Sequence, residues 1–499
     1  MNNSHNTVIL SGFPIEISLD NFRRETRNEK SVAYFLSHFH SDHYGGLDTT
    51  FPWVADSSIS KKIYCSSITA NLVTSILKIP TNRVVSLEFG ITMKVVNEPE
   101  LFVTLIPANH CPGAAQLLFE YRDKQNISKR VLHCGDMRFD SSMKLNRALL
   151  DAKARGGFDE VFLDSTYAKA THNFPSQSES ISMALDCIKK LLPPDSSLPT
   201  NLDSLKRKKD NSTWALSSAD VHAASVLTTH ESAISMKKTT LIDTDQTLVL
   251  ISTYSVGKER LIISIARTFG LMIYAPPQRV KTLRLLGIEE ADLNYFTSDR
   301  SKASIHIVSM RFLATTFPYI QPNFENLNRY LTAMNQSQII APPGHDDDND
   351  AANFISSFKS SIDTSSHRYK KIYGILPTGW CHELKEVSEG AMSLVSIPYS
   401  EHSSYSELIE YVTFLKPTLI TPTVFSDDKD FKRIRDIFSK YTNQTAAQKS
   451  FISLFSKSKK ENDNVVVIIE EAEEDVVEVV KNPKKQKISG QSTLNEFWS

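Results

Sequence analysis

The chain has 499 residues, of which 40% are hydrophobic and 23% are charged, and its 56 Lys and Arg against 57 Asp and Glu give a formal net charge of −1. This composition is that of an ordinary globular chain of two or three domains; it contains no apolar run that could span a membrane, and its first residues lack the pattern of a secretory signal. The five cysteines are far apart and form no CxxC pair, which argues against a disulfide framework and favours a reducing compartment.

The first 170 residues alternate short apolar runs with polar loops, and these runs predict the strands of a mixed α/β domain. The predicted strands cover residues 32–37, 101–107, 115–121, 129–135 and 160–164. Between the first two strands, residues 62–80 have helical spacing and end at a proline, which predicts a helix.

The composition changes beyond residue 190. Residues 193–240 are rich in Ser, Pro, Asp and Lys and lack periodicity, which predicts a disordered surface insertion. A strand at 246–252 and a helix at 259–269, ended by Gly270, follow it. After a polar loop at 344–353, the predicted elements are a strand at 393–400, a helix at 404–415 and a strand at 418–424. Beyond about residue 455, acidic and basic blocks alternate and predict a tail.

A histidine-rich loop directly follows the first apolar strand. Residues 37–43 read Ser-His-Phe-His-Ser-Asp-His. At the strand end, His38 and His40 point the same way because of the two-residue period, whereas Asp42 and His43 fall in the turn and can face a second ion. Imidazole and carboxylate groups suit zinc and similar divalent ions. An ordinary hydrogen-bonded polar loop is the alternative, but three histidines and an aspartate in six residues favour metal binding.

Two more candidate ligands follow predicted strands. His110 comes after the strand at 101–107, and Asp136 comes after the strand at 129–135. Either residue could be structural by itself. Their order after the histidine-rich loop, each at the end of a strand, favours metal ligation.

This order of motifs resembles the metallo-β-lactamase superfamily, which implies an αββα sandwich with a dinuclear metal site on one edge. Four further segments, FLDSTY (162–167), STYSVGKE (252–259), LPTGW (376–380) and IPYSEHSSY (397–405), resemble the DNA interstrand cross-link repair nucleases that include Artemis and Apollo. That family carries an α/β cap, called β-CASP, inserted into the lactamase fold. The resemblance implies a lactamase domain at 1–170 and 390–455, a cap at 171–389 and a flexible, disordered tail at 456–499.

The resemblance also assigns roles to individual residues. It implies that the first ion is held by His38, His40, His110 and Asp136, and the second by Asp42, His43, the bridging Asp136 and His402. Asp164 and Asp20 are implied to support the metal site, with Asp42, Asp136, Asp164 and His402 as the catalytic set. Val424 occupies a cap position where RNA-processing relatives carry His and DNA enzymes carry Val, which favours DNA.

The loop before the helix at 259–269 is a candidate phosphate site. Ser255, Gly257 and Lys258 at a helix N-terminus offer a hydroxyl, backbone N–H groups and a cation. The resemblance implies that the loop seats a terminal 5′-phosphate, and Thr166 is expected to contact DNA with it. A glycine-containing turn with a solvated lysine is the alternative. The spacing is not that of a P-loop, so nucleotide hydrolysis is not implied.

The function that the resemblance implies is a metal-dependent 5′-to-3′ DNA exonuclease of interstrand cross-link repair. It implies a nuclear location, DNA with 5′-phosphate ends as substrate, and two divalent ions, with zinc expected. The alternatives are an RNA-processing β-CASP endonuclease, a small-molecule hydrolase and a non-enzymatic scaffold.

The tail contains three candidate interaction motifs. A pattern resembling a PCNA-interacting box is formed by Gln491, Leu494, Phe497 and Trp498. Residues 484–487 resemble a short nuclear-localisation signal. The apolar run at 465–469 precedes acidic residues and resembles a SUMO-interacting motif, which would add a strand to its partner. A chance match at the terminus, and an acidic spacer or packed strand at 465–475, are the alternatives.

Overall fold

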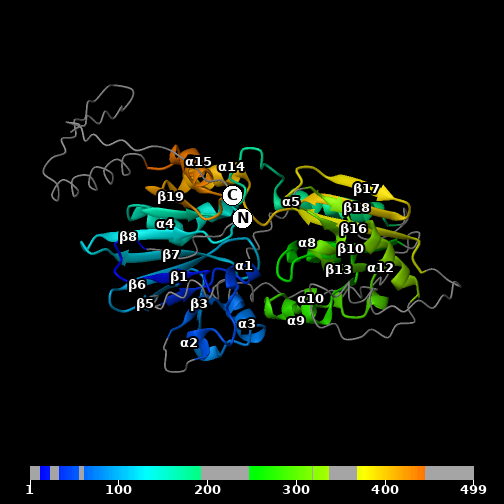
Figure 1. Ribbon diagram of the computed structural model, residues 1–499, viewed down its shortest axis with the longest axis horizontal. Helices are drawn as coiled ribbons and strands as arrows, with labels where there is room; N and C mark the ends of the chain where they lie inside the picture. Colours follow the sequence, from blue (N-terminus) through cyan, green and yellow to red (C-terminus); the bar gives the residue numbers. More distant parts are fainter. Residues whose placement is uncertain are drawn as a thin grey trace, which may run out of the picture. The chain divides into compact units, whose positions relative to one another are not determined.

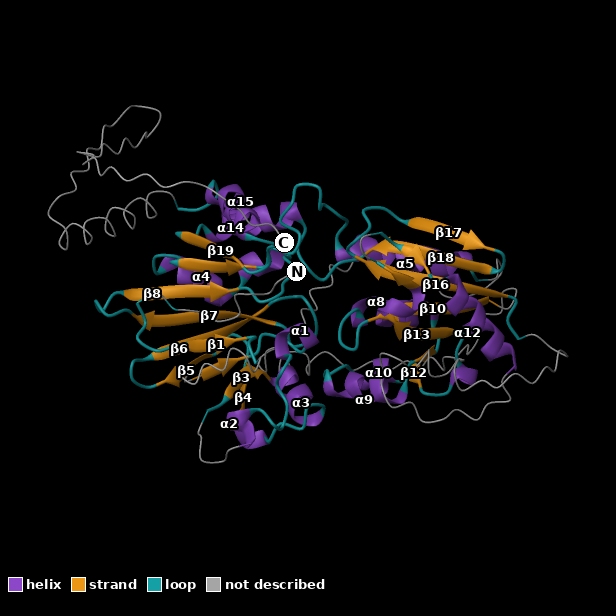
Figure 2. Ribbon diagram, viewed as in Figure 1, coloured by secondary structure: helices purple, strands orange, loops and turns teal. Residues whose placement is uncertain are grey.

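The structure is a computed structural model that describes residues 10, 12–22, 33–55, 61–192, 247–316, 319–336 and 368–443. The expected insertion at 193–240, the polar loop at 344–353 and the tail motifs lie outside these described residues. The described part is a mixed α/β structure that contains three sheets of four or more strands (Figures 1 and 2).

Two of these sheets form a sandwich. The four-stranded sheet is entirely parallel, in the order β1 (Ile17–Leu19), β2 (Ala33–Phe35), β3 (Ile63–Ser66) and β4 (Val84–Leu87). The six-stranded sheet has the order β19 (Leu419–Pro422), β9 (Glu160–Leu163), β8 (Ser128–His133), β7 (Ala115–Arg122), β6 (Leu101–Pro107) and β5 (Thr92–Val96). Its strands β5 to β8 are antiparallel neighbours, whereas β8, β9 and β19 run parallel.

Apolar side chains from both sheets fill the space between them. Phe35 of β2 packs edge to face on Phe119 of β7, with ring centroids 5.1 Å apart. Helices α1 (Ser41–Tyr44), α2 (Pro52–Ala55) and α3 (Ser67–Ser75) lie beside the four-stranded sheet, and α4 (Arg147–Ala154), α14 (Tyr405–Leu415) and α15 (Asp428–Ser439) lie beside the other (Figure 1). The two sheets with helices outside them confirm the expected αββα sandwich.

The third sheet belongs to the cap. Its seven strands have the order β12 (Phe296–Thr297), β11 (Ile273–Tyr274), β13 (Ile305–Ser309), β10 (Thr247–Thr253), β16 (Lys371–Thr378), β18 (Met392–Pro398) and β17 (Lys385–Glu389). Every pairing is parallel except that of β17 with β18. All seven residues of β10 are buried, as expected for a central parallel strand covered on both faces.

Helices and a short hairpin complete the cap. The helices are α5 (Gln177–Lys190), α8 (Glu259–Phe269), α9 (Pro277–Leu285), α10 (Glu290–Leu293), α11 (Met310–Leu313) and α12 (Phe324–Gln336), and the hairpin pairs β14 (Ala314–Thr315) with β15 (Gln321–Pro322). Helix α8 has the predicted bounds. It ends at Gly270 in the left-handed conformation, with φ 63°, which glycine adopts without strain.

The helix expected over residues 62–80 is shorter than predicted. Residues Ile63–Ser66 form strand β3 instead, and the helix α3 that follows ends at Ser75. The strand forms because these residues pair with β2 on one side and β4 on the other. Ser66 then begins the helix, because its hydroxyl accepts the backbone N–H of Thr69.

The return from the cap to the lactamase domain, expected at residue 390, differs in the structure. Strand β18 (Met392–Pro398) pairs with β16 and β17 in the seven-stranded sheet. The chain therefore leaves this sheet only after Pro398, and helix α14 is the first element of the returning segment. The difference matters because it places the candidate ligand His402 directly after a strand of the cap sheet.

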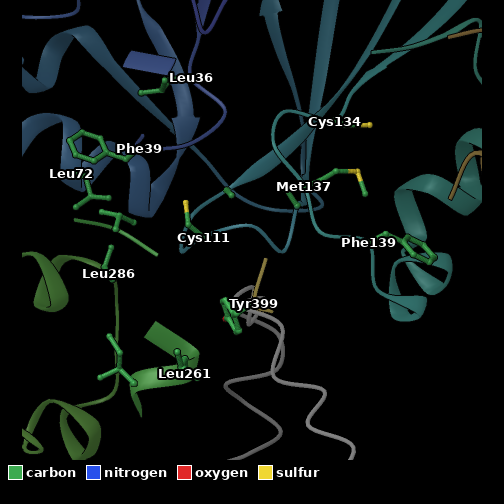
Figure 3. Close-up of a cluster of buried hydrophobic side chains, with 14 of the residues drawn as sticks. Leu36, Phe39, Leu72, Cys111, Cys134, Met137, Phe139, Leu261, Leu286 and Tyr399 are labelled. Carbon is green, nitrogen blue, oxygen red and sulfur yellow. The ribbon is translucent and has the colours of Figure 1, made fainter. Parts of the chain in front are cut away.

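One hydrophobic cluster continues from the lactamase domain into the cap. Figure 3 shows Leu36, Phe39, Leu72 and Cys111 of the lactamase domain near Leu261 and Leu286 of the cap. All five cysteines are free, and four of them are buried, which agrees with the prediction from their spacing. In the described residues, no helix combines the length and apolar character needed to cross a membrane.

Candidate metal centre

Five strands deliver the candidate ligands to one place. The loop with His38, His40 and His43 follows β2, and His110 follows β6. Asp136, which belongs to both predicted sets, follows β8, His402 of the second set follows β18, and Asp164 follows β9. These side chains and Asp20 form three groups. Within each group, the donor atoms all lie within 4.8 Å of one another.

The first group is the predicted set for the first ion. His40 Nδ1 lies 3.0 Å from His38 Nε2 and 3.1 Å from His110 Nε2. Asp136 Oδ2 lies 3.7 Å from the Nε2 atoms of both His38 and His110. Ligands at zinc–nitrogen distances of about 2.0–2.1 Å in a tetrahedron are about 3.3 Å apart, so this spacing fits a divalent ion.

The predicted set for the second ion also meets at Asp136. The same Oδ2 atom of Asp136 is 3.2 Å from His43 Nε2 and 3.9 Å from His402 Nε2. Asp42 Oδ2 is 3.8 Å from His43 Nε2, at the edge of the group, and its side chain is 60% exposed. Asp136 is therefore the one carboxylate that both sets share, as a bridging ligand would be.

The second nitrogen of each imidazole is occupied by another partner. Such partners fix the ring orientation and leave the other nitrogen for a metal. The pairs are His38 Nδ1 with Ser37 Oγ (2.9 Å), His40 Nε2 with the Val256 carbonyl (2.9 Å), His43 Nδ1 with Asp20 (2.8 Å), His110 Nδ1 with the Glu401 carbonyl (2.8 Å) and His402 Nδ1 with Asp164 (2.9 Å). Each ring thus presents its remaining nitrogen to the cluster.

Asp20 and Asp164 support the candidate ligands through hydrogen bonds. Asp20 accepts the backbone N–H and the hydroxyl of Ser37 in addition to His43 Nδ1. Asp164 accepts the backbone N–H of Met137, the residue after Asp136, on the oxygen that also binds His402. Both carboxylates are buried, so each ties a ligand to the backbone of a neighbouring loop.

The electrostatics of the cluster suit cation binding. Burial lowers the pKa of His38 and His110 well below the usual range, which keeps these imidazoles neutral, as ligation requires. Burial alone would raise the pKa of Asp136, but the charges of His43 and His402 hold it well below its usual range. Burial opposes protonation of His402, yet Asp164 and Asp136 raise its pKa to about 9. Metal binding at His402 therefore displaces a proton.

The predicted phosphate site has a different arrangement in the structure. Ser255 is exposed, but the backbone N–H groups of Gly257 and Lys258 are taken by the carboxylates of Glu259 and Glu401. The Lys258 ammonium is buried and donates to the Pro377 carbonyl, 2.5 Å away. The donors expected to seat a phosphate are thus occupied by protein groups, and the solvated lysine of the alternative is not found either.

Two other residues with predicted DNA-related roles lie close to Asp164. The Thr166 hydroxyl, expected to contact DNA, donates to Asp164 Oδ1 at 2.7 Å. The backbone of Val424 exchanges hydrogen bonds with the hydroxyl of Ser165, at 2.6 and 2.9 Å. The four residues of the PCNA-box pattern lie outside the described part of the chain.

Sequence reasoning missed Glu401 and the carbonyl of Val256. Glu401 holds His110 through its carbonyl and Lys258 through its carboxylate, and Val256 holds His40. Every residue has a backbone carbonyl, so the residue type does not reveal which carbonyl accepts a hydrogen bond. The role of Val256 therefore could not be predicted. The position of Glu401 beside His402 was the one available signal.

Replacing Asp164 with Asn tests the support of His402. We expect Asp164→Asn to weaken metal affinity by roughly 10–100-fold, because it removes the charged acceptor that orients the ring. Competition with a chromophoric chelator measures this loss. The matched control is Thr166→Val, which removes a hydrogen bond to the other carboxylate oxygen and leaves His402 untouched. Equal affinities in Asp164→Asn and wild type would contradict the assignment.

His306 lies outside the metal cluster, and its burial is expected to make the stability of the fold depend on pH. Its Nδ1 is 2.9 Å from the Tyr330 hydroxyl and its Nε2 is 3.1 Å from the Ala303 carbonyl, so both ring nitrogens have partners in the core. Burial lowers its pKa to about 3. The unfolded chain therefore binds a proton below about pH 6.5 that the folded chain excludes, so stability present above this pH is lost as the pH falls toward 3.

The expected size of this loss is about 1 kcal/mol between pH 7 and pH 5.5. Urea unfolding of the chelator-treated protein at both pH values measures it. His306→Leu should be less stable at pH 7 but should show a pH dependence smaller by this amount. If the free energy of unfolding differed between the two pH values by the same amount in His306→Leu as in the wild type, His306 would not be the source of this pH dependence.

Comparison with known proteins finds a family model and several relatives that resemble this chain. A family model described as DNA repair metallo-beta-lactamase matches residues 350–428. The chain is 31% identical to DNA ligase 6 of Arabidopsis thaliana over 90% of its own length and 26% of that protein. It is 30% identical to the DNA cross-link repair 1A protein of Homo sapiens, over 79% of its own length and 28% of that protein. It is 27% identical to the 5′ exonuclease Apollo of Gallus gallus, over 85% and 64% of the two chains.

The chain spans about a quarter of the length of the first two of these relatives. The matched region covers most of this chain. The comparisons and the His/Asp cluster together indicate a divalent-metal site in a repair-type metallo-β-lactamase fold.

Proposed function

We propose that this chain is a member of the DNA repair metallo-β-lactamase family and acts as a metal-dependent DNA nuclease that hydrolyses phosphodiester bonds from 5′ ends in interstrand cross-link repair. The observation that carries the proposal is the convergence of five histidines on the single carboxylate of Asp136. Relatives named for DNA cross-link repair and for 5′ exonuclease activity support the choice of substrate and polarity.

The proposed cofactor is a pair of divalent ions, with zinc expected. His38, His40, His110 and Asp136 would hold one ion, and Asp42, His43, Asp136 and His402 would hold the other. When bound, such ions supply Lewis acidity toward a phosphate oxygen and make water a nucleophile near neutral pH. Histidine-rich donor sets of this kind suit zinc, but manganese would also be accepted.

The residues of the chain position this chemistry. Asp136 carries the negative charge shared by both halves of the site, and its buried surroundings strengthen its attraction for cations. Asp20 and Asp164 keep His43 and His402 in the orientation that presents Nε2. No serine, cysteine or threonine nucleophile is required in this arrangement.

The RNA-processing alternative is tested by the choice of substrate. Full-length protein is incubated with 5′-phosphorylated DNA and RNA strands of the same sequence, and the products are resolved by length. We expect stepwise shortening of the DNA from its 5′ end and little change in the RNA, in line with Val424 at the cap position discussed above. Preferential internal cleavage of the RNA would overturn the proposal and favour the alternative.

The partners and location remain proposals that rest on the sequence. The tail residues Gln491, Leu494, Phe497 and Trp498 would bind PCNA, and residues 465–475 would bind SUMO. The basic residues at 484–487 and the repair function support a nuclear location. Attachment to a replication clamp by a tail would raise the local concentration of the nuclease at replicating DNA.

A further inference from the structure

We propose that Tyr254 and Trp380 are base-stacking residues that hold unpaired nucleobases of the DNA strand beside the metal centre. The inference rests on the proposed function and deepens it, since it specifies that the site reads the bases of a single-stranded end as well as its phosphates. It also gives Lys258 a role as the residue that joins the two loops that carry these rings.

The topology brings the two aromatic residues to the edge of the cap sheet that faces the metal ligands. Strands β10, β16 and β18 are parallel neighbours, so their carboxyl ends lie at the same edge. Tyr254 directly follows β10, Trp380 follows β16, and the ligand His402 follows β18. Ligands of open parallel sheets bind at such carboxyl ends.

The two rings approach different ligands of the metal centre. The Tyr254 ring is 6.1 Å from the ring of His40, a candidate ligand of the first ion. Trp380 packs on Tyr167 at 5.8 Å, and Tyr167 in turn lies 6.1 Å from His402, a candidate ligand of the second ion. A strand bound at the metal centre would therefore have two aromatic side chains within reach.

Both rings are substantially exposed, although most aromatic side chains of the described residues are buried or partly buried. Tyr254 is 50% exposed and Trp380 is 40% exposed. Among the described Phe, Tyr and Trp residues, only Tyr319 is also exposed, and no ring contact joins it to the metal centre. Exposed aromatic faces beside a phosphodiester-binding centre are the features of single-strand recognition, because every base has a face that can stack.

Lys258 holds the two loops in a fixed relation. Its ammonium lies 4.6 Å from the centre of the Tyr254 ring and donates to the carbonyl of Pro377, three residues before Trp380. The turn itself is tightly packed, since a side chain at Gly379 would collide with the hydroxyl of Tyr167. The rings are thus preorganised, which reduces the entropy lost when bases bind.

Paired bases are covered on both faces by their neighbours in a duplex, so only unpaired bases can use these rings. A test must therefore separate contacts to bases from contacts to the sugar–phosphate chain. The full-length protein with Asp136→Asn, which should bind strands without cutting them, is titrated against two labelled 5′-phosphorylated single strands. One strand carries all its bases, and the other has abasic sites in place of the bases at its 5′ end.

We expect the Asp136→Asn protein to bind the strand with bases more tightly. Added Tyr254→Ala or Trp380→Ala should raise the Kd for that strand roughly tenfold and leave the Kd for the abasic strand nearly unaffected. Trp380→Phe should restore most of the preference, because it keeps a stacking face. The matched control is Tyr319→Ala, which removes a ring that is 75% exposed and should change neither Kd.

Two results would overturn the inference. One is an equal rise in the Kd for both strands in Trp380→Ala. This would mean that the ring only supports the fold of the loop. The other is equal affinity of the Asp136→Asn protein for both strands. In these cases the nuclease proposal stands; it fails together with the inference only if this protein binds neither strand and the wild type cleaves neither.

Discussion

Replacing Asp136 with Asn is expected to reduce DNA cleavage by about 1,000-fold or more, the largest effect of any single change in the molecule. Asp136 Oδ2 lies within 3.9 Å of the Nε2 atoms of four histidines, so one substitution withdraws the negative charge from both halves of the site. The amide is nearly the same size, so the fold should persist. Initial rates on a 5′-phosphorylated single strand measure the effect, and circular dichroism checks the fold.

The matched control is Asp42→Asn. Asp42 approaches only His43, and most of its side chain is exposed, so its loss affects one half of the site. We expect this variant to retain far more activity than Asp136→Asn, and to regain more of it when the metal concentration is raised. If Asp136→Asn kept activity within tenfold of the wild type, Asp136 would not be the shared ligand.

Replacing Arg138 with Met is expected to lower the free energy of unfolding by about 3 kcal/mol. Arg138 is 2% exposed, and its guanidinium donates to Glu407 of α14 and to the carbonyls of Ser400 and Pro175. Its loss removes the charged partner of the Glu407 carboxylate and the hydrogen bonds that join the Asp136 loop to the segment that carries His402. Urea unfolding, in chelator and in excess zinc, measures the change with and without metal.

The control for this prediction is Lys144→Met. Lys144 pairs with Glu410 of the same helix α14, but both side chains are substantially exposed. An exposed pair contributes between about 0 and 1 kcal/mol, so Lys144→Met should have little effect. Similar stabilities of Arg138→Met and Lys144→Met would show that the buried guanidinium is not what joins these segments.

Much of the metal centre could be predicted because its signals are local. Strand ends are visible as apolar runs, and the candidate ligands His110 and Asp136 directly follow such runs. The αββα fold followed from the resemblance that these motifs carry. The same local reasoning gave α8 its correct bounds, since Gly270 marks its end.

The rest could not be predicted because it depends on distant neighbours. Whether Lys258 is solvated or buried is decided by Pro377 and Glu401, 119 and 143 residues away. The acceptor of His40 is a carbonyl 216 residues away. The strand at Ile63–Ser66 was predicted as helix because its periodicity is ambiguous over four residues, and its pairing with β2 and β4 decides the outcome.

We propose that divalent ions held by the His/Asp cluster make this chain a DNA nuclease. The most direct measurement is the cleavage of a 5′-phosphorylated single strand by chelator-stripped, full-length protein to which zinc is returned in steps. We predict no cleavage by the stripped protein and a rise in activity that levels off at two ions per chain. Cleavage at the wild-type rate by the metal-free protein, or no cleavage by protein shown to hold two ions, would contradict it.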